Sequence, residues 1–118
     1  MTDKKQHIID ILYQTLQDRK DADPKKSYVA SLYKKGSKQI AKKLGEEAVE
    51  LVIDAVRLDE KPSKAGRVKN FKEEAADLLF HYLVLLSHHD IEPEEIFQVL
   101  EKRLGVGGHE EKKSRAKK

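Results

Sequence analysis

Residues 46–50 read EEAVE and residues 73–77 read EEAAD, so the chain carries one acidic pattern twice. Each copy lies among apolar residues with helical spacing, and side chains three positions apart share one face of a helix. The acidic residues paired in this way are Glu47 with Glu50 and Glu74 with Asp77. If the two helices pack antiparallel, the four carboxylates meet at one place.

Four carboxylates at one place repel one another strongly. Two like charges about 4 Å apart cost roughly 4 kcal/mol at an effective dielectric of about 20, and a small domain has a net stability of only about 5–15 kcal/mol. Either a divalent cation neutralises the group or the side chains point into water, and a single cluster would be interpreted as a solvated helix face. Because both clusters are flanked by apolar positions, the sequence favours a metal site. Oxygen ligands without sulfur or imidazole suit Mg²⁺, with Mn²⁺ as a substitute.

The apolar periodicity predicts an all-α protein, most simply a helical bundle of about four main helices. The expected helices run from about Lys5 to Arg19, from Ser37 or Lys38 to Leu58, from Arg67 to His88 or His89, and from Pro93 to the glycines that begin at Gly105. Residues 27–35 fit either a short helix or an extended arm. The stripes expected to face the core include Ile8, Ile9, Leu12 and Leu16, then Ile40, Leu44, Ala48, Leu51, Val52 and Ala55.

The helix expected over residues 67–88 is apolar on most sides, and such a helix must be buried on most sides. A chain of 118 residues offers it few partners. The sequence therefore predicts a homodimer, with this helix central to the interface.

Composition predicts a single domain over residues 1–108, followed by a flexible basic tail over residues 109–118. The tail holds five basic and two acidic residues, which accounts for the net charge of +3. No basic face or recognition motif of a nucleic-acid binder is found elsewhere. The chain has no cysteine, no signal-peptide pattern and no long apolar stretch, so we expect a cytoplasmic protein without a membrane segment.

Two longer blocks resemble a known family. Residues 27–53 (SYVASLYKKGSKQIAKKLGEEAVELVI) and 73–86 (EEAADLLFHYLVLL) are similar to the phosphoribosyl-ATP pyrophosphatase family of histidine biosynthesis. That family belongs to the all-α nucleoside triphosphate pyrophosphohydrolases, together with the MazG proteins and the all-α dUTPases. The superfamily signature, ExxE followed by ExxD, is met by Glu47, Glu50, Glu74 and Asp77. The resemblance covers residues 27–104.

The resemblance implies a MazG-like fold and the second step of histidine biosynthesis: phosphoribosyl-ATP and water give phosphoribosyl-AMP and pyrophosphate. It implies Mg²⁺ ligands at Glu47, Glu50, Glu74 and Asp77. Glu46 and Glu50 are the candidates for activating the water. Lys35 and Lys43 would neutralise phosphate oxygens, and Ser27 and Tyr28 would line the substrate cleft.

Three departures from the family pattern leave the ligand positions untouched: Val29, Phe80 and a long connector over residues 57–70. The longer connector bears on the choice of substrate. One alternative function is therefore a house-cleaning pyrophosphohydrolase of nucleoside or deoxynucleoside triphosphates. Another is a non-enzymatic helical interaction module.

Two polar residues near the motif have more than one interpretation. In one interpretation, His81 hydrogen-bonds a carboxylate that binds the metal or contacts the base of the nucleotide. In the other, it is a buried histidine whose hydrogen bonds are made with a neighbouring helix. Asp54 extends the acidic strip but lies outside the motif, so we expect it to be solvated or paired with Lys43 or Arg57.

Overall fold

A computed structural model describes residues 7–61 and 63–104. The described residues form five helices and no strand: α1 (Ile8–Asp18), α2 (Tyr28–Lys35), α3 (Ser37–Glu60), α4 (Arg67–His88) and α5 (Pro93–Leu104). The prediction of an all-α protein is confirmed. Among the described helices, none combines the length and the apolar character needed to cross a bilayer.

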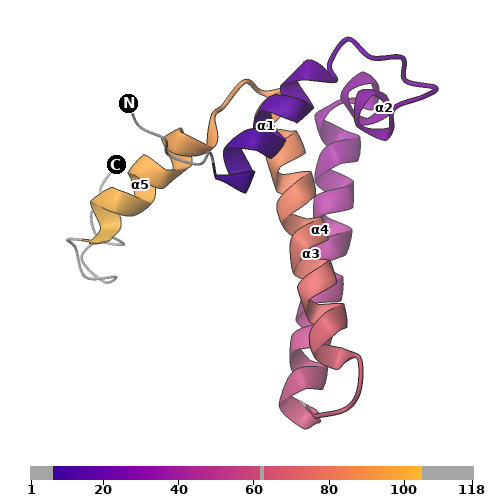
Figure 1. Ribbon diagram of the computed structural model, residues 1–118, viewed down its shortest axis with the longest axis vertical. Coiled ribbons are helices and arrows are strands. Elements are labelled where there is room, and N and C mark those ends of the chain that lie inside the picture. Colours follow the sequence, from indigo (N-terminus) through magenta and orange to yellow (C-terminus); the bar gives the residue numbers. More distant parts are fainter. Residues whose placement is uncertain (1–6, 62, 105–118) are drawn as a thin grey trace.

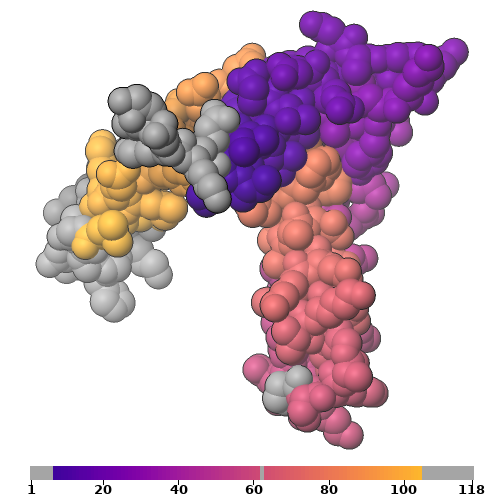
Figure 2. All heavy atoms as spheres, viewed as in Figure 1, coloured from indigo at the N-terminus to yellow at the C-terminus, as the bar shows by residue number. Residues whose placement is uncertain are grey.

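The two long helices, α3 and α4, form an antiparallel hairpin (Figure 1). The short helices α1 and α2 pack at the end of the hairpin where α3 begins and α4 ends, and α5 contacts α1 and extends away from the hairpin. The other end of the hairpin stands clear of α1, α2 and α5 (Figure 2). The hairpin therefore brings the helices that carry the two acidic segments side by side.

Residues 28–35 are helical, which decides between the two interpretations of this segment. Ser27 begins the helix as its N-cap, because its hydroxyl oxygen accepts a hydrogen bond of 3.1 Å from the Ala30 backbone N–H. Gly36 ends the helix with a φ of +88°, a conformation that residues with a side chain rarely adopt. The next helix begins directly at Ser37, so Gly36 turns the chain sharply from α2 into α3.

The core lies where α1, α2, α3 and α4 meet. Its most buried apolar side chains are Leu16, Leu32, Ile40, Leu83 and Val84. The Tyr33 hydroxyl bonds the Leu16 carbonyl oxygen at 3.1 Å and the Ser87 hydroxyl at 2.7 Å, which ties three helices together. The well-packed end of the molecule thus supports a hairpin whose other end is free of the short helices.

Some details of the prediction were wrong. Ile8 is 66% exposed and Val52 is 62% exposed, although both were placed on faces turned to the core. Both side chains are apolar and in helical register, but no element among the described residues covers them. Two helix ends also differ from the expected ones. Helix α1 begins at Ile8 instead of about Lys5, and helix α3 continues to Glu60 instead of ending at Leu58. The basic tail at 109–118 and the domain limit at 108 lie outside the described residues.

Candidate functional site

An acidic cavity of about 540 Å³ opens on one side of the hairpin. Its lining comes from α3 and α4: Asp54, Asn70, Glu73, Glu74, Ala76 and Asp77. Helical spacing explains why these residues line the same cavity, because Asn70, Glu74 and Asp77 recur every three or four residues along one side of α4. The two helices that carry the acidic patterns pack antiparallel, which is the condition under which their carboxylates would meet.

Glu74 is the centre of this group of carboxylates. Desolvation, followed by the adjacent carboxyl group of Glu50 and the charges of Asp77 and Asp54, raises the pKa of Glu74 to about 7. A raised carboxyl pKa indicates that the surroundings do not neutralise the negative charge of the ionised group. Four acidic side chains of two helices therefore act on one another.

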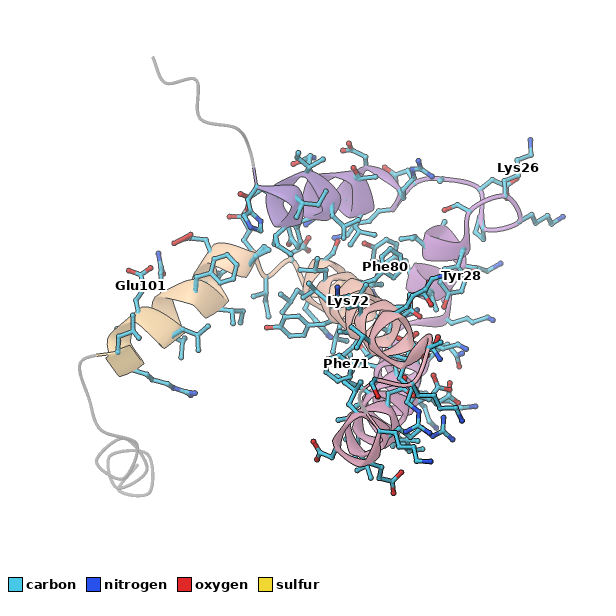
Figure 3. The ribbon with its side chains drawn as sticks, turned by 60° about the horizontal axis from the view of Figure 1, so that its bottom comes forward. Lys26, Tyr28, Phe71, Lys72, Phe80 and Glu101 are labelled. Atoms are coloured by element: carbon cyan, nitrogen blue, oxygen red, sulfur yellow. The ribbon has the colours of Figure 1, made fainter. Side chains whose placement is uncertain are left out.

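Tyr28 and His81 close the side of the site nearest to α2. The Tyr28 hydroxyl lies 2.8 Å from Nε2 of His81, and Nδ1 of the same ring lies 2.5 Å from Oε1 of Glu47. Desolvation raises the pKa of Tyr28, with smaller contributions from Lys43, which lowers it, and from Glu47 and other acids, which raise it. Figure 3 shows Tyr28 reaching from α2 toward the hairpin, near Phe80. Tyr28 is thus linked through His81 to Glu47, one of the predicted ligand positions.

Two ion pairs border the carboxylates. Nζ of Lys43 lies 3.6 Å from Oε1 of Glu46, and a guanidinium nitrogen of Arg57 lies 3.8 Å from Oδ1 of Asp54. Arg57 is one of the two partners expected for Asp54. The structure therefore places Lys43 and Glu46 at the border of the site, together with Tyr28.

Two predicted substrate residues lie elsewhere or have another role. Lys35 lines a separate cavity with Lys38, Gln39 and Lys42, beside the junction of α2 and α3. The Ser27 hydroxyl caps α2. Neither residue is among those lining the acidic cavity.

The donor set fits a hard divalent cation. Oε1 of Glu47 and Oε2 of Glu74 are buried and have no aligned hydrogen-bond donor within the described residues. Buried charged oxygens are costly unless they are paired or coordinate a metal. In residues 7–61 and 63–104, however, no three acidic or histidine side chains are already gathered tightly enough to hold an ion.

Besides Ala76, three polar lining residues were not among the predicted site residues: Asp54, Asn70 and Glu73. Asn70 is one helical turn before Glu74, and Asp54 is one turn after Glu50, so helical spacing alone places both on the acidic side. The four-residue signature includes neither position, although this spacing could have indicated both.

Comparison with known proteins gives a consistent result. The family described as "Phosphoribosyl-ATP pyrophosphohydrolase" matches residues 9–104. Proteins named phosphoribosyl-ATP pyrophosphatase are similar over most of their length. The one from Geobacter sulfurreducens is 45% identical over 92% of this chain and 93% of its own. The protein from Geobacter metallireducens is 46% identical over 93% of this chain and 94% of its own. The protein from Azospirillum brasilense is 45% identical over 92% of this chain and 90% of its own.

Proposed function

The chain belongs to the phosphoribosyl-ATP pyrophosphohydrolase family, and on that premise we propose that it hydrolyses phosphoribosyl-ATP to phosphoribosyl-AMP and pyrophosphate in histidine biosynthesis. Water adds at phosphorus, and the α–β phosphoanhydride bond breaks. The acidic cavity between α3 and α4 supports this proposal most directly. The signature residues Glu74 and Asp77 line it, and Glu50 adjoins Glu74, although neither Glu50 nor Glu47 is among the lining residues. We place the reaction in the cytoplasm, where ATP-derived nucleotides are made.

We propose that Glu47, Glu50, Glu74 and Asp77 hold Mg²⁺. Such an ion, when bound, neutralises phosphate oxygens and lowers the pKa of a coordinated water. Proteins hold Mg²⁺ through a few carboxylates and leave other positions to water and substrate phosphates. This mode of binding suits an open cavity lined by carboxylates.

The residues at the border of the site are assigned from their places. Lys43 supplies an ammonium group that donates to phosphoryl oxygens as charge develops on them. Tyr28, whose hydroxyl is engaged by Nε2 of His81, lines the substrate cleft. Glu46 and Glu50 are the candidates for accepting the proton of the attacking water. Glu46 is held by Lys43, while Glu50 adjoins Glu74. The substrate-binding roles of Lys35 and Ser27 are proposed from the resemblance alone.

A substrate panel tests the function. We expect Mg²⁺-dependent release of pyrophosphate from phosphoribosyl-ATP, and at least tenfold slower release from dUTP and dCTP, measured with a coupled pyrophosphate assay. The reverse preference would identify a house-cleaning pyrophosphohydrolase. No release from any nucleotide, with or without Mg²⁺, would favour a non-enzymatic interaction module.

We also propose that two copies of the chain pair through their hairpins. The apolar side of the hairpin consists of exposed residues at helical spacing, with Val49, Val52, Ile53 and Val56 from α3 and Val68 and Leu79 from α4. On α3 this stripe is turned roughly 140° from the acidic stripe, at 100° per residue. An apolar cavity of about 470 Å³ adjoins it. Two hairpins packed through these sides form a four-helix bundle with both acidic cavities open. Most of the exposed stripe belongs to α3, so we propose that α3 joins α4, the helix expected at the interface, in forming it.

Val52→Glu should convert the dimer into a monomer, because a charge would be buried at the centre of the apolar stripe. Light scattering coupled to size exclusion reports the mass. The matched control is Val99→Glu, the same change at an exposed valine of α5, which should stay dimeric. A monomeric wild-type protein at high concentration would contradict the proposal.

A further inference from the structure

His81 is a buried polar side chain that has no part in the proposed reaction. It lies on α4 one turn after Asp77, and its side chain is 8% exposed. Its ring is packed edge-on against Tyr28 and Phe80, with centroid separations of 5.8 and 5.2 Å. The ring is therefore fixed by contacts with α2 and with its own helix.

The two ring nitrogens have different neighbours. Nδ1 lies 3.1 Å from the Asp77 carbonyl oxygen and 2.5 Å from Oε1 of Glu47. Because both neighbours are acceptors, Nδ1 must carry a proton. The other nitrogen, Nε2, meets the hydroxyl of Tyr28 at 2.8 Å. The ring is thus held at both nitrogens, and one of them faces a signature carboxylate.

The Glu47 contact is close but not aligned as a hydrogen bond, since the N–H of Nδ1 points better at the Asp77 carbonyl oxygen. A small movement of the Glu47 carboxylate would bring its Oε1 in line and leave Oε2 for an ion. Carboxylates that bind metals are commonly fixed by a hydrogen bond from a neighbouring side chain. His81 is in position to supply that bond.

We propose that His81 is a positioning residue, which holds the Glu47 carboxylate in place for the proposed Mg²⁺ site while Tyr28 fixes the other side of its ring. The inference rests on the proposed Mg²⁺ site. The alternative, a histidine that only fills the core, predicts that an apolar side chain of similar size would serve equally well.

Titration of the full-length chain with Mn²⁺ tests the proposal, with free Mn²⁺ followed by electron paramagnetic resonance. His81→Leu should weaken Mn²⁺ binding by roughly 10–100-fold, the usual loss when an outer partner of a metal ligand is removed. His81→Asn should bind within about threefold of wild type, because its amide nitrogen takes the place of Nδ1. Circular dichroism verifies that each variant is folded.

His88→Leu is the matched control. His88 lies on the same helix, stacked on Tyr33 with centroids 6.0 Å apart, and its replacement should leave Mn²⁺ affinity unchanged. If folded His81→Leu binds Mn²⁺ as tightly as wild type, the inference fails and the metal site stands. If wild type does not bind Mn²⁺, both fail.

A second pair of variants keeps the test decisive where His81→Leu does not fold. His81→Gln places its amide near Nε2, toward Tyr28, rather than near Glu47. The proposal requires His81→Asn to bind Mn²⁺ at least tenfold more tightly than His81→Gln. Equal affinities in these two folded variants would overturn it.

Discussion

Glu50→Gln or Asp77→Asn should lower the turnover of phosphoribosyl-ATP roughly a thousandfold, equivalent to about 4 kcal/mol of transition-state stabilisation. Each change removes one proposed Mg²⁺ ligand and keeps the size of the side chain. Both side chains are exposed, so the fold should persist. Pyrophosphate release at saturating substrate measures the effect.

The same variants should be at least as stable as wild type when Mg²⁺ is absent. The Glu50 carboxyl adjoins Glu74, and its neutral amide relieves part of the repulsion that raises the pKa of Glu74. Asp59→Asn is the control, an exposed carboxylate of α3 outside the cavity, and it should keep full activity. Unfolding of Glu50→Gln would indicate that the carboxylate serves the structure rather than the reaction.

The sequence predicted the hairpin and its acidic side because both depend on local repetition. Paired acids three residues apart, set among apolar residues, specify one helix face wherever the helix packs. The short α2 was harder to predict, since eight residues give little periodicity and the N-cap of Ser27 decides its start.

Other features depend on what surrounds a residue rather than on spacing. Val52 is apolar and in register for burial, yet it is exposed because no element in the described part of the chain covers it. Lys35 and Lys43 look equivalent in sequence, but the turn at Gly36 directs Lys35 to a different cavity. The contact between His81 and Glu47 joins residues on two helices, and neither helix pattern alone predicts it.

Removing divalent cations should abolish pyrophosphate release and lower the melting temperature, and the drop in melting temperature should be larger at pH 8.5 than at about pH 5.5. The ordinary pKa of a glutamate is 4.5, and that of Glu74 in the folded chain is about 7. The folded chain therefore holds this proton more tightly than the unfolded chain. The stability contributed by this proton is fully present below about pH 4.5 and is lost as the pH rises through 7.

Bound Mg²⁺ should offset this loss of stability, because it neutralises the negative charge of the deprotonated Glu74 carboxylate. At one hundred times its dissociation constant, a ligand specific to the folded state stabilises it by roughly 2.7 kcal/mol, which raises the melting temperature by about 10 °C. Glu74→Gln should flatten the pH dependence of the metal-free protein and raise its melting temperature at pH 8.5. Glu101→Gln, at an exposed position of α5 far from the hairpin (Figure 3), removes one negative charge without either effect. Melting curves of the metal-free wild type that do not change between pH 5.5 and 8.5 would contradict the crowding of carboxylates around Glu74, and with it the reason for placing an ion there.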